Sequence, residues 1–138
     1  MKQLDSGIWV FDSGYRGECP KEETEQMMYG CWMDYQFPNA IWFHVPNETG
    51  TKSGPQFVLK RQKMGVKRGV SDVIILSNGV AHCGAVMELK RADRTKSKVS
   101  KEQATFLEKV ADQGKFAAIA YGAEQLKKAT LFYFGVDK

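Results

Sequence analysis

Two short apolar runs, each with an acidic residue at one end, constrain the fold of this chain more than any other feature. Asp72 directly precedes the run 73–76, Val-Ile-Ile-Leu, and Glu88 lies near the end of a second apolar run. Between the runs, Ser77-Asn78-Gly79 contains the Asn-Gly pair that favours the tight reversal of a β-hairpin. The sequence therefore predicts two antiparallel strands, each with an acid at the same end.

The register of this hairpin decides whether the acids meet. If Leu76 pairs with Gly84, Asp72 stands opposite Glu88, and directly opposed residues have Cβ atoms about 5 Å apart. Lys90 projects from the same face as Glu88, because side chains alternate along a strand. We therefore expect two carboxyl groups and an ammonium group to converge, the alternative being a solvated surface pair of Glu88 and Lys90.

A metal ion is the expected companion of these acids. Apolar residues on both faces of the hairpin indicate covered interior strands, and buried charges cost desolvation unless they are paired or bind a metal. Two close carboxylates repel each other, so a proton or a cation must lie between them. Oxygen ligands without His or Cys suit Mg²⁺ or Mn²⁺. Lys90 then provides a positive charge beside a substrate phosphate.

The length of 138 residues suits one domain with a sizeable core. We expect one α/β domain over residues 1–138, with residues 1–18 as an N-terminal extension and a core over about 20–135. No apolar run reaches the length of a membrane span, and 8–11 is too short for a signal peptide, which favours a cytoplasmic protein. Three widely spaced cysteines without a C-x-x-C pair indicate neither disulfides nor zinc.

The net charge of +4 is modest, but the basic residues cluster on both sides of the acids. A cationic rim around an acidic pocket favours binding of a polyanionic nucleic-acid backbone, and solvated loops are the alternative. The residues in question are Lys60, Arg61, Lys63, Lys67 and Arg68 before Asp72, and Arg91, Arg94, Lys96, Lys98 and Lys101 after Lys90.

The remaining elements complete a mixed sheet with flanking helices. A helix is expected after Pro20, with an apolar stripe formed by Met27, Met28, Cys31, Trp32 and Tyr35. Ser100 and Gln103 match a capping box at the start of another helix. The other expected elements are strands at 8–11, 41–45, 116–121 and 130–134, helices at 53–65 and 122–126, and a mobile basic loop at 91–99.

The order of motifs resembles the PD-(D/E)XK nuclease superfamily, and within it the virus-type replication-repair nuclease (VRR-NUC) domain. The matching motifs are Glu22-x-x-x-Gln26 with Trp32 beyond it, Val45-Pro46-Asn47-Glu48, Leu59-Lys60, Gly69-Val70-Ser71-Asp72, Met87-Glu88-Leu89-Lys90-Arg91, Ser100-x-x-Gln103 and Tyr121-Gly122. Ser71 departs from the superfamily pattern, which has proline there. This resemblance implies a restriction-endonuclease-like core and a Mg²⁺- or Mn²⁺-dependent endonuclease that cuts branched DNA, such as flaps or Holliday junctions.

The resemblance also implies roles for individual residues. Asp72, Glu88 and the carbonyl of Leu89 would hold the metal, and Lys90 would orient or activate the attacking water. Glu22 would lie near the metal, with Glu25 as the alternative helix acid, and Gln103 would brace the site or the DNA. The expected DNA-binding residues are Lys60, Arg61, Lys67, Arg68, Arg91, Arg94, Lys96 and Lys98.

Two other functions are open at this point: a non-catalytic DNA-binding module of the same fold, and a general or restriction-type DNA nuclease. Cutting two strands with one metal site for each chain favours a homodimer, and stand-alone phage versions resemble dimeric junction resolvases, which would act in the host cytoplasm. Several apolar residues suit either a dimer interface or the core: Trp9, Phe11, Trp42 and Phe132.

Overall fold

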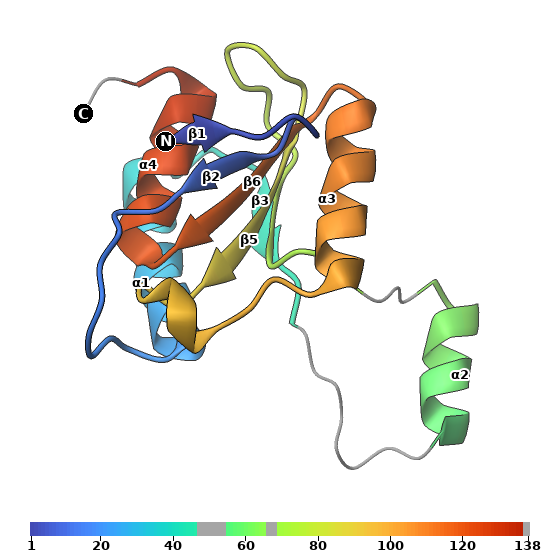
Figure 1. Ribbon diagram of the computed structural model, residues 1–138. Coiled ribbons are helices and arrows are strands. Elements are labelled where there is room, and N and C mark those ends of the chain that lie inside the picture. The colour runs from blue at the N-terminus through green and yellow to red at the C-terminus, as the bar shows by residue number, and fades with distance from the viewer. Residues whose placement is uncertain (47–54, 66–68, 137–138) are drawn as a thin grey trace.

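One mixed β-sheet of six strands runs through the molecule (Figure 1). The computed structural model describes residues 1–46, 55–65 and 69–136. The strands are β1 (Lys2–Gln3), β2 (Trp9–Phe11), β3 (Trp42–His44), β4 (Val73–Ile75), β5 (Ala85–Lys90) and β6 (Phe116–Tyr121). Their order is β1-β2-β6-β5-β4-β3, in which β2, β6 and β5 are parallel and the other neighbours are antiparallel. The predicted α/β fold with a mixed sheet is confirmed.

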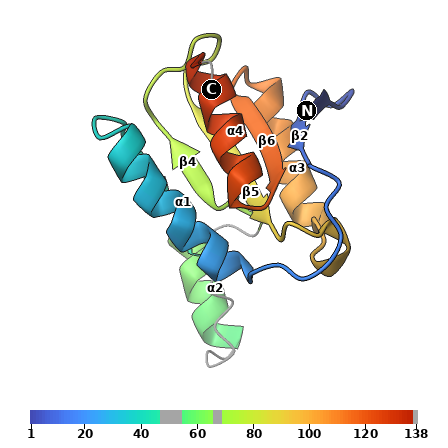
Figure 2. The ribbon, with the colours of Figure 1, turned by 90° about the vertical axis from the view of Figure 1, so that its left-hand side faces the viewer.

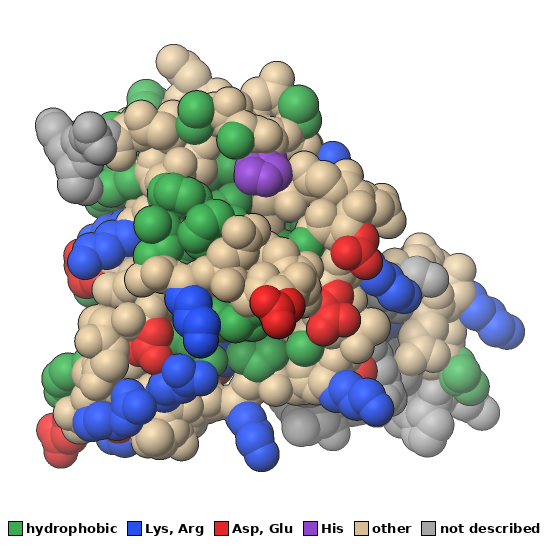
Figure 3. All heavy atoms as spheres, turned by 45° about the horizontal axis from the view of Figure 1, so that its top comes forward, with side chains coloured by type: hydrophobic (Ala, Val, Ile, Leu, Met, Phe, Trp, Pro, Cys, Tyr) green, Lys and Arg blue, Asp and Glu red, His purple; other side chains and the backbone are tan. Residues whose placement is uncertain are grey.

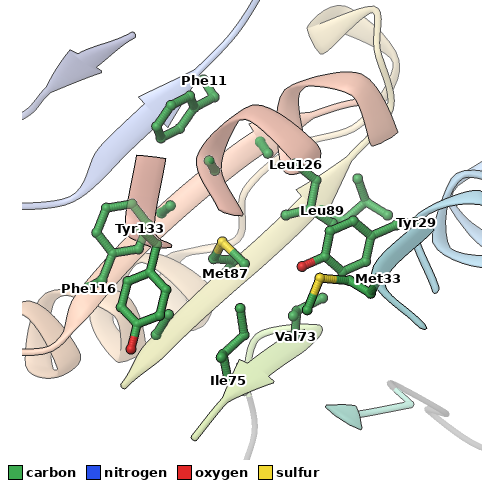
Figure 4. Packing of buried hydrophobic residues seen from close by; sticks show 14 residues of the cluster. Phe11, Tyr29, Met33, Val73, Ile75, Met87, Leu89, Phe116, Leu126 and Tyr133 are labelled. Carbon is green, nitrogen blue, oxygen red and sulfur yellow. The ribbon is translucent and has the colours of Figure 1, made fainter. Parts of the chain in front are cut away.

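Helices cover both faces of the central strands. Helices α1 (Glu22–Gln36) and α4 (Ala123–Phe134) pack on one face, and α3 (Lys101–Asp112) packs on the other (Figures 1 and 2). All residues of β5 and β6 are buried, as expected for strands that are covered on both sides. The larger core cluster lies under α1 and α4 (Figure 4), and includes Tyr29, Met33, Met87, Leu89, Phe116, Leu126 and Tyr133.

The register of β4 and β5 is the one that the sequence predicts, but their connection is different. Val73 pairs with Met87 and Ile75 with Ala85, and continuation of this register sets Asp72 opposite Glu88. The prediction of a tight hairpin turn at Asn78-Gly79 is wrong, because Gly79 does not adopt the positive φ that such a turn requires.

A longer loop, residues 76–84, joins the two strands around the side chain of Tyr133. The Tyr133 hydroxyl accepts a hydrogen bond from the Gly84 amide at 2.7 Å and donates one to the Ser77 carbonyl at 2.6 Å. A Cβ atom on Gly79 would lie 2.5 Å from the Tyr133 ring. Glycine is therefore needed at position 79 for this close approach, and not for the dihedral angles of a hairpin turn.

Helix α4 replaces two predicted elements, a short helix at 122–126 and a strand at 130–134. The side chains of Leu126, Ala129, Thr130 and Tyr133 are buried, and their spacing is that of one helical face. The strand prediction rested on the aromatic and β-branched residues of 130–134. Packing against the sheet outweighs this local preference, which is weak and depends on context.

The first 18 residues, expected as an extension outside the core, contribute two strands to the sheet. Strand β2 pairs in parallel with β6, and β1 pairs with β2. The Phe132 ring lies 4.9 Å from that of Trp9 and 6.1 Å from that of Phe11, and Trp42 packs on Tyr29. Of the two uses weighed for these aromatic residues, packing within the chain is the one that the structure shows.

Helix α1 forms as predicted but presents a different face to the core. Its buried residues are Glu25, Tyr29 and Met33, which follow each other at intervals of four. The predicted apolar stripe is mostly exposed, because Met27, Met28, Cys31 and Tyr35 lie on the outer side while Trp32 is half-buried.

Two basic segments lie at the periphery. Helix α2 (Pro55–Lys63) confirms the predicted helix and stands away from the sheet (Figure 1). The expected loop at 91–99 instead contains a short 3₁₀-helix, η1 (Arg94–Lys96), which Asp93 caps. No helix within the described ranges has the length and apolar character needed to cross a membrane.

Candidate active site

Three ionisable groups converge where β4 and β5 meet α3. Glu88 and Lys90 are only 1% and 7% exposed, and Lys90 Nζ lies 3.8 Å from Glu88 Oε2. Asp72 Oδ2 accepts a hydrogen bond of 2.8 Å from the amide of Leu89, the residue between them. The alternative of a solvated surface pair is therefore wrong, because Glu88 and Lys90 are buried.

The environment of Glu88 favours its neutral form. Its Oε2 atom accepts a hydrogen bond of 3.1 Å from Gln103 Nε2, whereas Oε1 is buried and has no hydrogen-bond partner in the described part of the chain. Burial, together with the neighbouring Asp72 carboxyl, raises the pKa of Glu88 to about 10, and Lys90 opposes this shift only in part. In the protein alone, Glu88 therefore favours its protonated form.

The position of Asp72 is fixed from both sides. On the β3 side, the Asp72 carbonyl accepts a hydrogen bond of 2.7 Å from the Val45 amide. On the other side, Gly69 has a φ of 76°, and a Cβ atom there would lie 2.6 Å from the Glu102 carbonyl carbon. The absence of a side chain at Gly69 thus allows the segment before Asp72 to lie against the first turn of α3.

Gln103 caps helix α3 and also binds Glu88, and its capping bond orients it for the second contact. Its side-chain Oε1 accepts a hydrogen bond from the Ser100 amide at 2.9 Å, while the Ser100 hydroxyl accepts one from the Gln103 amide, so the predicted capping box is confirmed. This bond orients the side-chain amide, and its remaining NH₂ group points to Glu88 Oε2.

Glu22 is the helix acid that faces the site. It is half-buried near the start of α1, and burial raises its pKa, while Lys90 lowers it and Asp72 raises it further. Glu25 is used elsewhere, because its carboxylate accepts a hydrogen bond from the Ala123 amide at the start of α4. Of the two candidate helix acids, Glu22 is therefore the one that faces the site, and Glu25 is not.

The basic residues do not form one free surface. The Arg91 guanidinium donates to the carbonyls of Cys19 and Pro20, at 2.6 and 3.2 Å, and so holds the segment before α1. Arg94 forms an ion pair of 3.1 Å with Asp12 and lies over the ring of Tyr121.

Other predicted DNA-binding residues are placed at the surface. Lys60, Lys96 and Lys98 are exposed and Arg61 is half-buried, whereas Lys67 and Arg68 lie outside the described residues. Figure 3 shows Lys and Arg side chains spread over the lower half of that view. Arg91 is engaged by the chain itself, whereas Lys60, Lys96 and Lys98 leave their charges exposed to solvent.

Asp93 and Glu25 have structural roles beside the site. The sequence did not single out Asp93, and it indicated Glu25 only as the alternative helix acid. Asp93 accepts hydrogen bonds from the Thr95 hydroxyl at 2.6 Å and the Gly17 amide at 3.0 Å, and these bonds lower its pKa to about 2. The Asp-x-Thr spacing was an available signal, since Asp commonly caps a following turn. The partner of Glu25 lies 98 positions away, and no local pattern reveals it.

The donor atoms of this site fit a magnesium ion. Asp72 and Glu88 offer hard carboxylate oxygens, one of them the unpartnered Glu88 Oε1. No group of three or more His, Cys, Asp and Glu side chains suited to a metal occurs among the residues that the structure describes. Two carboxylates are nevertheless enough for Mg²⁺, which usually keeps several waters and takes one or two carboxylates from the protein.

Comparison with known proteins supports the fold at the level of structure. No protein-family model and no curated protein matches the chain. A solved structure described as a VRR_NUC domain protein superimposes with a TM-score of 0.71 and 22% sequence identity, over 90% of this chain and 94% of that one. Because the similarity extends over nearly the whole of both chains, the fold of this chain is that of a VRR_NUC domain protein.

Proposed function

We propose that this chain is a magnesium-dependent endonuclease that hydrolyses phosphodiester bonds in branched DNA. The observation that carries the proposal is the close pair of half-buried Asp72 and buried Glu88, with buried Lys90 beside it. The shared fold with a VRR_NUC domain protein and the basic residues around the acids add support. Neither a structural ion pair nor a plain DNA-binding surface requires two neighbouring acids, one of them fully buried.

Asp72 and Glu88, with the main-chain carbonyl of Leu89, would hold the Mg²⁺ or Mn²⁺ ion. When bound, the ion would act as a Lewis acid on the phosphate and lower the pKa of a coordinated water. The Glu88 carboxyl would give up its proton on binding, because the cation replaces that proton as the positive partner of Asp72.

The other residues of the site would orient the attacking water and the Glu88 carboxylate, and would stabilise the charge that develops on the phosphate. The Lys90 ammonium would orient the attacking water and offset the negative charge that develops on the phosphate oxygens. Gln103 would hold the Glu88 carboxylate in one orientation through its tethered side-chain amide. Glu22, which faces Lys90 and Asp72, would accept hydrogen bonds from water at the same site. The expected products carry a 3′-hydroxyl and a 5′-phosphate.

The test is a cleavage assay on DNA of one sequence in three forms: a four-way junction, a flap and a plain duplex. We expect cleavage of the branched forms with Mg²⁺ and none with EDTA. Binding of all forms without cleavage would identify a DNA-binding module instead. Equal cleavage of the duplex would identify a general or restriction-type nuclease. Sedimentation velocity on the same samples tests the symmetric dimer that cutting two strands favours.

Two variants separate metal binding from the chemical step. Asp72→Asn is expected to abolish cleavage and to weaken Mg²⁺ binding in calorimetry. Lys90→Ala is expected to leave Mg²⁺ binding largely intact while cleavage slows by roughly 100-fold or more, as for removal of a group that stabilises developing charge. A Lys90→Ala variant that cuts at the wild-type rate would remove Lys90 from the mechanism.

A further inference from the structure

Within the part of the chain that the structure describes, no helix covers one part of the sheet face that carries the acids. Helix α3 packs against β5 and β6, whereas β4 and β3 continue beyond it to the edge of the sheet. Phe43 pairs with Ile74, and the Leu76 amide donates to the Ile41 carbonyl one step further along. Ile41, Phe43 and Leu76 are 61%, 47% and 58% exposed.

These residues share a face with the candidate active site. Asp72, Ile74 and Leu76 alternate along one strand, so their side chains lie on the same side of the sheet. Phe43, opposite Ile74, is one strand across and two residues along from Asp72, which corresponds to about 8 Å between main-chain positions. The apolar surface is therefore continuous with the row of acids.

Unpaired bases fit this surface better than an intact duplex does. A duplex presents phosphates and sugars, and its bases are already stacked on each other. Bases that are splayed out at a branch point expose apolar faces, which stack on aromatic side chains, while Lys90 and the basic rim suit the adjoining phosphates. An aromatic residue whose main chain lies about 8 Å from that of Asp72 can contact a base next to a bound phosphate.

We propose that Phe43, with Ile41 and Leu76, forms a subsite that binds unpaired bases beside the phosphate that is cut. This subsite rests on the proposed function, because that function identifies the ligand as DNA. It adds to the proposal the part of the DNA that the enzyme recognises. It makes Phe43 a specificity residue, which distinguishes branched or single-stranded DNA from duplex before any bond is broken.

The experiment measures binding in EDTA, where cleavage plays no part. Fluorescence anisotropy compares a flap that carries unpaired thymines with a fully paired duplex of the same length. Phe43→Ala is expected to weaken flap binding by roughly 5- to 150-fold, the range for loss of one base–aromatic stack, and to change duplex binding by less than twofold. Phe43→Trp is expected to retain flap binding, since Trp also provides a stacking surface.

The control is Tyr35→Ala, which removes an aromatic side chain that is 85% exposed on α1, against the other face of the sheet. It should leave both affinities unchanged. Leu76→Ala, on the subsite face, should lower flap affinity in the same direction and keeps the test available if Phe43→Ala does not fold.

Equal losses on flap and duplex, or no loss on either, would overturn the subsite. So would a fall from dimer to monomer in sedimentation velocity on Phe43→Ala, because the surface would then be an interface between two copies of the chain. Selective flap binding without Mg²⁺-dependent cleavage would leave the subsite standing and reject the nuclease proposal, so the two failures are distinguishable.

Discussion

Glu88 shows how one side chain can oppose folding and still be useful. Its carboxyl is almost fully buried beside Asp72, and its pKa is raised to about 10. In the unfolded chain the group ionises near pH 4.5. Above that pH, folding without a metal must therefore take up a proton at Glu88, so the contribution of Glu88 to stability is most favourable at low pH and falls as the pH rises towards 10.

Glu88→Gln should reverse this loss. The Gln amide is neutral at every pH, can donate to Asp72 and can still accept from Gln103. In EDTA we expect the variant to be more stable than wild type at pH 8 and the difference to shrink towards pH 5, with an upper bound of about 1.4 kcal/mol for each pH unit. Thermal unfolding at several pH values measures it. A difference that does not vary with pH would show that Glu88 is not protonated in the folded chain.

Arg94 and Arg91 were both expected to contact DNA, and the structure separates them. Arg94 is half-exposed in its pair with Asp12, so its guanidinium can reach a phosphate. Arg94→Ala should lower the slope of log affinity against log salt by about 0.9, the value for one phosphate contact.

Arg91→Ala is the matched comparison. Its guanidinium binds two main-chain carbonyls, so we expect an unchanged salt slope and a loss of about 1–2 kcal/mol of stability. Titrations of labelled DNA at several salt concentrations, with unfolding curves, check both variants. A lower slope of log affinity against log salt for Arg91→Ala would show that Arg91 contacts a DNA phosphate after all.

Among the elements, α3 shows a helix cap that also serves the site. Ser100→Ala removes the side-chain bond to the Gln103 amide, which should cost about 1 kcal/mol and lower the melting temperature by about 3 °C. We also expect cleavage to slow several-fold, because the first turn of α3, which carries Gln103, is held less firmly, although the main-chain amide of residue 100 can still donate to Gln103 Oε1. Ser100→Thr keeps the cap and should restore both. Loss of stability with full cleavage would show that the cap does not influence the site.

The elements also show where local patterns mislead. The capping box of α3 and the β4–β5 register followed from neighbouring residues. The end of the chain did not, because residues 130–134 have strand-like composition and yet complete α4. The buried face of α1 was likewise misjudged, since Glu25 lies inward to cap α4 while the apolar residues Met28 and Tyr35 lie outward.

On the scale of the whole molecule, the site joins elements from most of the chain: Asp72 just before β4, Glu88 and Lys90 from β5, Gln103 from α3 and Glu22 from α1. A ligand of this site should therefore stabilise the complete fold. At 100 times its dissociation constant, Mg²⁺ should add about 2.7 kcal/mol to the free energy of unfolding. Melting curves recorded with Mg²⁺ and with EDTA measure this gain in stability.

Asp72→Asn is the control for this effect and should melt at the same temperature with and without Mg²⁺. An equal rise in wild type and variant would indicate general salt stabilisation, and would remove the support that the magnesium site gives to the proposed function.

The sequence by itself determined the α/β class, the pairing that sets Asp72 opposite Glu88, and the cap that orients Gln103, because each depends on the alternation or spacing of residues close in the chain. Only the tertiary structure decided which acid of α1 faces the site, which arginine is engaged by the chain, and that an apolar strip with Phe43 continues from the acids. These depend on contacts between segments far apart in sequence, whose geometry is set when the helices pack on the sheet.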